Sequence, residues 1–178
     1  GGTRINGLNQ VVYAGVSKGA TINLGAGNDT LILDAGAATL VVSGQVKIRG
    51  DARSGNPLDR LLANFAANTD GADVVAMIDA VLERGLSVKL GGGADTLAIC
   101  STVIDGRVRS GTGSGADVVL IDDAIFADRV RFGTGSGSDS VFIDSNGEPS
   151  GKPTVFRGRA KLRTRRGNDQ IAIGLPGE

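Results

Sequence analysis

A Gly-x-Asp motif followed by alternating aliphatic residues recurs along this chain at a regular interval. The anchoring aspartates are Asp29, Asp73, Asp95, Asp117, Asp139 and Asp169. From Asp73 to Asp139 successive copies lie 22 residues apart, and the next step is 30 residues, one period plus an insertion of eight. The step from Asp29 to Asp73 is 44 residues, which counts as two periods. The 178 residues therefore predict about eight copies of one structural unit.

The residues after each anchor alternate as they do in a short β-strand. Two and four positions after the anchor stand aliphatic pairs such as Leu97 and Ile99. A second pair, such as Val130 and Phe132, follows at thirteen and fifteen positions, with another apolar pair between the two. One such unit cannot bury its inward face alone, so units must stack. The sequence therefore predicts an all-β, single-stranded, right-handed parallel β-helix of about eight 22-residue coils, with residues 1–178 in one domain.

The composition agrees with a narrow, stacked interior. The chain has 29 Gly but only five Phe, one Tyr and no Trp. Glycine is favoured at coil corners, where the backbone needs positive φ or a close approach to the next coil. Because the chain has no His, Ser-His-Asp and Cys-His catalysis are excluded. Because it has one Cys, an internal disulfide framework is excluded as well. We therefore expect a protein that is not an enzyme.

Two segments depart from the period. Residues 49–70 lack the anchor and form either a divergent coil or an insertion. Within them Asn56 precedes Pro57, and apolar residues follow at helical spacing, so a short helix at 57–67 is favoured over an irregular strand. Residues 145–153 are rich in Gly, Pro and Ser and are predicted to form a surface loop.

The anchor resembles the calcium-binding nonapeptide G-G-x-G-x-D-x-L-x of the RTX (repeats-in-toxin) family. The best matches are residues 25–31, 91–97, 113–119 and 135–141, although the first Gly of the family pattern is absent. More closely, the chain is similar to degenerate Gly-Asn-Asp solenoid arrays of large secreted bacterial surface and adhesin-like proteins. That resemblance covers nearly the whole chain apart from 49–70, and it implies a secreted or cell-surface location.

In the RTX family, the Asp carboxylate and turn carbonyls of adjacent coils hold Ca²⁺, a cation that takes oxygen ligands. Carried over to this chain, the resemblance implies calcium ligands at Asp95, Asp117 and Asp139. A second interpretation is structural: each carboxylate accepts hydrogen bonds from backbone N–H groups of its own corner. Stacked carboxylates repel one another, so either backbone donors or cations must compensate them.

The outward positions of the first strand carry no charge in six coils. A strand that is apolar on both faces is normally covered on both, so we expect this face to pack against another subunit or another part of a longer chain. The alternative is that these are the scattered exposed apolar residues common on protein surfaces. The candidate interface residues are Ile32, Val74, Val118, Leu120 and Phe142.

The outward positions of the second strand are basic, although the chain as a whole has 19 basic and 19 acidic residues. The candidate residues are Arg107, Arg109, Arg129, Arg131, Arg159, Lys161 and Arg163. This face could bind an anionic polysaccharide or extracellular DNA, meet acidic corners of the next molecule in a fibre, or simply keep the protein soluble. No aromatic residues are interleaved with the arginines, so base stacking is not predicted.

These features predict a non-catalytic extracellular structural or adhesive module, a homo-oligomer or filament that self-associates through the apolar face or the open solenoid ends. The alternative is a calcium-binding RTX-type module of a secreted enzyme or adhesin that binds an anionic polymer through its basic face. No apolar run reaches the roughly 18 residues of a membrane-spanning helix. Cys100 is predicted to be either an incidental small residue near the surface or the site of an intermolecular disulfide.

Overall fold

The computed structural model describes six parts of the chain, and every regular element within them is a β-strand. The described residues are 19–25, 28, 30–34, 40–50, 71–145 and 152–174. All strand pairs are parallel, and they form three sheets. The helix predicted at 57–67 and most of the loop predicted at 145–153 lie outside the described residues.

Each coil contributes one strand to each sheet in turn. Sheet 1 holds β1 (Ala20–Gly25), β4 (Val46–Gly50), β7 (Leu86–Gly92), β10 (Val108–Ser114), β13 (Val130–Ser136) and β16 (Ala160–Arg166). Sheet 2 holds β2 (Thr30–Asp34), β5 (Val74–Ile78), β8 (Thr96–Cys100), β11 (Val118–Asp122), β14 (Ser140–Ile143) and β17 (Gln170–Ile173). Sheet 3 holds β3 (Leu40–Val42), β6 (Ala80–Leu82), β9 (Val103–Ile104), β12 (Ile125–Phe126) and β15 (Val155–Phe156).

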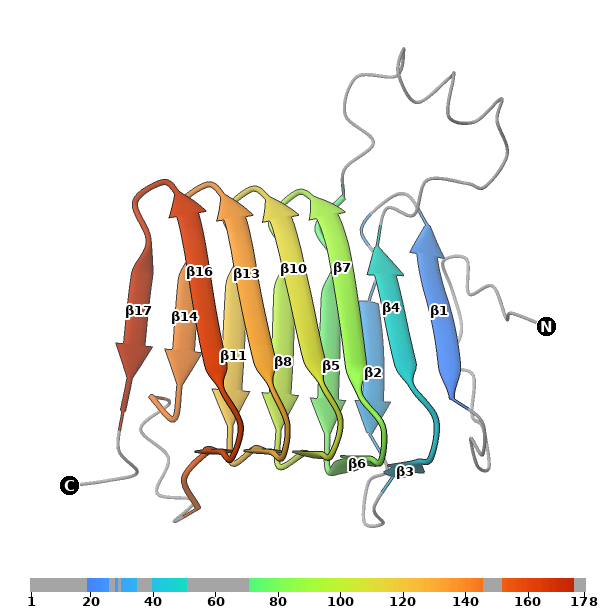
Figure 1. The fold of residues 1–178 in the computed structure, drawn as a ribbon. Helices are drawn as coiled ribbons and strands as arrows, with labels where there is room; N and C mark the ends of the chain where they lie inside the picture. The colour runs from blue at the N-terminus through green and yellow to red at the C-terminus, as the bar shows by residue number, and fades with distance from the viewer. Residues whose placement is uncertain are drawn as a thin grey trace.

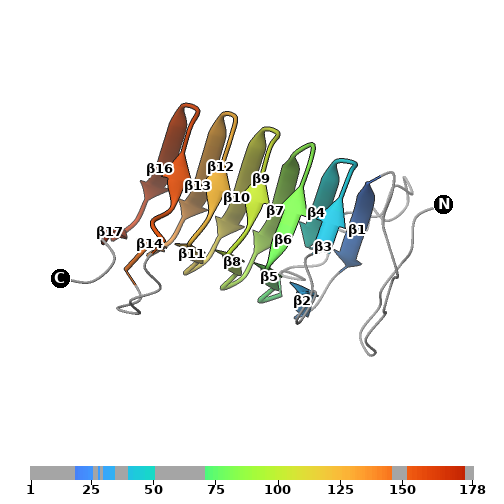
Figure 2. The same cartoon turned by 90° about the horizontal axis from the view of Figure 1, so that it is seen from below.

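The chain winds as a right-handed solenoid. In Figure 1 the strands of sheet 1 rise at the front, those of sheet 2 descend behind them, and successive coils follow from right to left. The short strands of sheet 3 cross the underside, as the view from below shows in Figure 2. The predicted all-β parallel β-helix is therefore confirmed. Its three strands per coil correspond to the three apolar segments of the repeat.

The 22-residue period of the sequence is the length of one coil. Val108 pairs with Leu86 on one side and with Val130 on the other, and each partner is 22 residues away. The longer step places Val130 opposite Ala160, because eight additional residues lie between β14 and β15. Side chains with the same place in the repeat therefore stack in rows along the solenoid axis.

The first long interval contains an insertion and not an additional coil. Strand β2 pairs directly with β5, so that Thr30 lies opposite Val74 across the interval of 44 residues. Counting this interval as two coils was wrong, and of the two interpretations of residues 49–70 the structure favours the insertion. It enters after β4, which extends to Gly50. Within the described residues, sheets 1 and 2 hold six strands each.

Aliphatic side chains from all three sheets fill the interior. Strands β8 and β11 have the same alternation of buried and partly exposed residues, with Leu97 and Ile99 fully buried. Phe126 of sheet 3 stacks on Phe156 of the next coil with ring centroids 5.0 Å apart, and it meets Phe132 edge to face. The alternation of inward and outward side chains predicted from the sequence thus separates a buried, largely aliphatic core from an outer surface.

Glycines mark the corner where sheet 1 passes into sheet 2. At Gly115 the backbone has a φ of 132°, a region that side chains rarely allow, and its N–H donates to the carbonyl of Ser136 in the next coil at 2.8 Å. A Cβ atom at Gly115 would collide with the carbonyl oxygen of Gly93. Hydrogen bonding between coils therefore requires glycine here.

We expect Gly115→Ala to lower the free energy of unfolding by at least about 3 kcal/mol, because it combines a positive φ with a collision against backbone. Gly111→Ala is the matched control, since a Cβ atom there meets nothing within 4 Å. That variant should gain about 0.5–1 kcal/mol from the smaller entropy of its unfolded chain. Urea unfolding followed by circular dichroism measures both, and equal stabilities would contradict this account of the corner.

Candidate functional site

Four of the anchoring aspartates are buried beneath the glycine corner and belong to a ladder of hydrogen bonds between coils. Asp73, Asp95, Asp117 and Asp139 each expose no more than 1% of their surface. Oδ1 of Asp117 accepts a hydrogen bond of 3.0 Å from the backbone N–H of Asp95, one coil earlier. The same bond joins Asp95 to Asp73, Asp139 to Asp117 and Asp169 to Asp139, at 2.9–3.1 Å. We call these residues the aspartate ladder.

The aspartate ladder joins coils to one another. The structural interpretation of the sequence placed the hydrogen-bond donors in the corner of the same coil, whereas these donors belong to the neighbouring coil. Each carboxylate therefore satisfies a buried N–H group that would otherwise cost about 1–3 kcal/mol. This explains why Asp returns once in every coil, at the place where the backbone turns.

Across the described coils, the aspartate ladder does not bring three side-chain ligands together for a calcium ion. Calcium takes six to eight oxygen ligands, and nowhere in the described parts of the chain do three acidic, His or Cys side chains come together to hold a metal. The turn carbonyls of Ser114 and Ser136 accept hydrogen bonds from the glycines of the preceding coil. Calcium at Asp95, Asp117 and Asp139 stays a prediction from the family resemblance.

A chelator should leave the thermal unfolding midpoint unchanged, because a backbone N–H group of the neighbouring coil already donates to Oδ1 of Asp95, Asp117 and Asp139. Added calcium would have to act at an atom such as the buried Oδ2 of Asp139, which accepts no hydrogen bond from the described residues. Differential scanning calorimetry with EDTA, with added calcium and with added magnesium makes the comparison. A lower midpoint in EDTA that calcium restores and magnesium does not would instead support the metal site.

Asp117 has a hydrogen-bond environment that suits its protonated form. The Thr112 hydroxyl lies 2.5 Å from Oδ2 of Asp117 and 3.0 Å from the carbonyl oxygen of Thr134. A hydroxyl has one proton, so it cannot donate fully to both. If Asp117 is protonated, it donates to Thr112, which in turn donates to Thr134. Burial raises the pKa of Asp117, and the charge of Asp139 also raises it, against the lowering effect of its hydrogen bonds to Thr112 and Asp95.

Asp117→Asn should therefore be at least as stable as the unmutated protein at neutral pH. Because the pKa of Asp117 is raised in the folded state, ionisation of this residue destabilises the fold. The free energy of unfolding should therefore increase as pH falls through the folded pKa toward the unfolded value of about 3.9. The Asn side chain still offers an oxygen that accepts the N–H of Asp95 and a group that donates to Thr112, but it does not titrate. The variant should therefore lose the part of the pH dependence of stability that comes from Asp117. Unfolding free energies between about pH 4 and pH 8 test this.

Asp105→Asn, at an exposed carboxylate, is the control for a change of one charge. If Asp117→Asn is less stable at neutral pH than both the control and the unmutated protein, the ladder requires the ionised carboxylate, and the assignment of the proton is wrong.

Part of the outward side of sheet 2 forms an uncharged surface, which we call the apolar face; the row beside it contains Asp34 and Asp122. Two rows of outward residues cross all six strands, and neither row contains a charged residue. Ile32 is 59% exposed and Val74 is 36% exposed. Leu120 lies opposite Phe142 in the register, and both are half-buried, as is Val118. The five residues predicted for this surface thus lie on one face of one sheet.

Cys100 lies in the row that borders the apolar face, between Ile78 and Asp122 of the neighbouring strands. Burial raises the pKa of its thiol, and the nearby carboxylates of Asp122, Asp123 and Asp79 raise it further. The half-buried thiol is therefore protonated at neutral pH and is a weak nucleophile.

The cationic residues lie on the outward side of sheet 1, in rows that follow the axis; we call this side the basic face. One row joins Lys47, Ser87, Arg109, Arg131 and Lys161. The predicted Arg107, Arg129 and Arg159 directly precede strands β10, β13 and β16, so they form a second row at the corner and are not strand residues. The structure thus brings all seven predicted cations onto one side.

The third row of the basic face contains the predicted Arg163, but the place of the two glycines at its centre was not predicted from the sequence. It joins Lys89, Gly111, Gly133 and Arg163 across four neighbouring strands. Among the described residues, the cations of the basic face form no side-chain ion pair with a carboxylate. The pKa of Lys161 is lowered, first by the charge of Arg163 and then by burial and by Arg159 and Arg131. Like charges therefore crowd this face.

No protein-family model, curated protein or solved structure matches the chain. The resemblance to RTX repeats therefore rests on the motif and stays a prediction. Within the described ranges there is no helix of the length and apolar character that crossing a membrane requires. The function has to be inferred from the two outward faces.

Proposed function

We propose that this protein is a non-catalytic structural or adhesive module that associates with further copies of itself through the apolar face. The observation that carries the proposal is that sheet 2 has an aliphatic inward side and two outward rows without a charge. Its inward residues, such as Val119 and Ile121, are fully buried, while two of its outward rows are uncharged across six strands. Antiparallel sheets commonly leave one side to water, but parallel sheets are usually covered on both.

The size of the apolar face predicts a weak contact between two copies. Six strands at about 4.8 Å, crossed by outward positions over about 13 Å of strand, give a flat area of roughly 400 Å². A stable interface buries about 800 Å² on each partner. Association should therefore depend strongly on protein concentration, and it should strengthen where many coils are aligned.

The edge strand β17 offers a second route to assembly. Ile171 and Ile173 of β17 are 49% and 70% exposed, whereas Val141 and Ile143, at the same inward positions one coil earlier, are 0% and 7% exposed. A further coil, from a second copy or from a longer chain, would cover these side chains and pair with the edge strand. A secreted or cell-surface location is part of the proposal and rests on the resemblance to surface arrays.

The double variant Leu120→Lys with Phe142→Lys should abolish lateral association, because burying two lysines without partners is costly. Sedimentation velocity over a range of concentrations should show self-association of the unmutated protein and a monomer for the variant. Ile32→Lys is a second variant with less effect on folding, because this side chain is already 59% exposed.

Ser87→Lys with Ser114→Lys adds the same charge on sheet 1 and serves as the control. Circular dichroism verifies that each variant is folded. If folded variants of the apolar face sediment like the unmutated protein and the control at every concentration, the proposal is wrong.

The alternative function predicted from the sequence has two parts. The calcium-binding part has no support in the geometry of the aspartate ladder. The polymer-binding part concerns the basic face, which lies on a different sheet from the apolar face.

A further inference from the structure

Two glycines in the middle of sheet 1 are not required by the fold. Gly111 and Gly133 occupy outward positions within β10 and β13, and neither has a positive φ. A Cβ atom at Gly111 would meet nothing within 4 Å, and at Gly133 its nearest neighbour would be 3.6 Å away. Gly113 and Gly135, by contrast, need glycine, because a Cβ atom would collide with a backbone carbonyl.

Glycine inside a strand costs about 0.5–1 kcal/mol relative to alanine and often marks a place where a ligand or another backbone comes close. Since no neighbour among the described residues needs the space at Gly111, the bare backbone leaves room for a ligand. The outward glycines of β10 and β13 together form the floor of a shallow trough.

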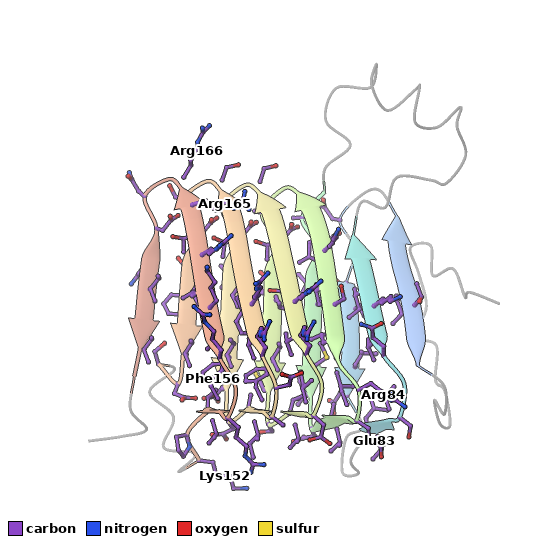
Figure 3. The ribbon with its side chains drawn as sticks, viewed as in Figure 1. Glu83, Arg84, Lys152, Phe156, Arg165 and Arg166 are labelled. Carbon is purple, nitrogen blue, oxygen red and sulfur yellow. The ribbon has the colours of Figure 1, made fainter. Side chains whose placement is uncertain are left out.

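Cations surround the floor of this trough. In the row of Gly111 and Gly133, Lys89 stands on one side and Arg163 on the other, while Arg109 and Arg131 form the next row. One hollow of about 380 Å³ is lined by residues that include Lys47, Lys89, Arg109 and Gly111. A second of about 360 Å³ is lined by Gly113, Gly135, Ser136, Arg165 and Arg166. Figure 3 shows nitrogen-tipped side chains across the front of sheet 1, with Arg165 and Arg166 at its upper end.

The rows of charge run along the solenoid axis with up to one cation per coil, a spacing of about 4.8 Å. A complementary ligand is a linear polymer with one negative charge per monomer and a similar rise. We infer that the basic face binds an acidic polysaccharide, with sugar rings on the glycine floor and carboxylates against Arg109 and Arg131. The mutual repulsion of the cations, seen at Lys161, is relieved when such a chain binds.

Nucleic acid fits this face less well. Duplex DNA carries one charge per about 1.7 Å of its axis, much denser than the cation rows, and its bases are read by elements that enter a groove. Single-strand binders stack bases on aromatic side chains, whereas the outward positions of the described strands of sheet 1 contain none.

The first experiment measures binding of polygalacturonate, which has one carboxylate per sugar, by calorimetry at several salt concentrations. The unmutated protein should bind, with an affinity that falls as salt rises. Arg109→Ser with Arg131→Ser should weaken binding at least about tenfold and reduce the slope of log affinity against log salt by about two. Serine is accommodated in this row, since Ser87 already occupies it.

Arg84→Ser with Lys152→Ser removes the same charge from the exposed lower edge in Figure 3 and should retain most of the affinity. The trough itself is tested at Gly111, where a side chain has room. Gly111→Val fills the floor without changing charge and should weaken binding several-fold. Gly111→Arg fills the same floor but adds a cation beside Lys89, so it should bind more tightly than Gly111→Val.

Gln170→Arg, on the exposed edge of sheet 2, is the control for the added charge and should bind like the unmutated protein. The inference is overturned if the protein does not bind polygalacturonate at low salt, if duplex DNA of equal total charge binds as tightly, or if Gly111→Val has no effect. The variant with lysines at the apolar face should bind the polymer normally, so the two proposals can fail independently.

Discussion

The whole structure depends on one constraint: around most of each coil, the backbone must lie as close to the next coil as two paired β-strands lie to each other. The strands achieve this with ladder hydrogen bonds, but the corner between sheets 1 and 2 must achieve it where the backbone turns. There Gly115 removes the Cβ atom that would strike the coil before it, and Asp117 accepts the N–H of Asp95 one coil away. The corner residues and the inward aliphatic residues are thus fixed by the neighbouring coil. Only the outward positions are free to vary with function.

Exact stacking gives those outward positions an unusual property. Side chains at the same position of successive coils form a row along the solenoid axis. Arg109, for example, lies opposite Arg131, and Leu120 lies opposite Phe142. One sheet can therefore present an uncharged strip while another presents a cationic strip. A partner would recognise a repeated surface, where most enzymes and receptors use a single pocket.

Much of this arrangement could be predicted from the sequence, because period and alternation are local signals. They place Ile99 inside and Leu120 outside, and the structure agrees. The interval of 44 residues was misinterpreted because an insertion close to one period long resembles a coil. The sequence did not predict that the hydrogen-bond donor to Asp117 belongs to the neighbouring coil, because a carboxylate at a corner can accept from the N–H groups of either coil. Gly111 and Gly113 look alike in sequence, and only φ and the space around each separate them.

The ladder bonds between coils run along the solenoid axis, and this gives the molecule a particular response to tension. A pull on the two ends of the described solenoid would load the bonds of one coil boundary before those of the next, since β1 and β17 each pair with one described strand only. Each coil of the regular repeat that detaches would release 22 residues, or roughly 75 Å of extended chain, while the rest of the stack keeps its register. Such a solenoid would lengthen in steps under load and would keep its remaining coils paired.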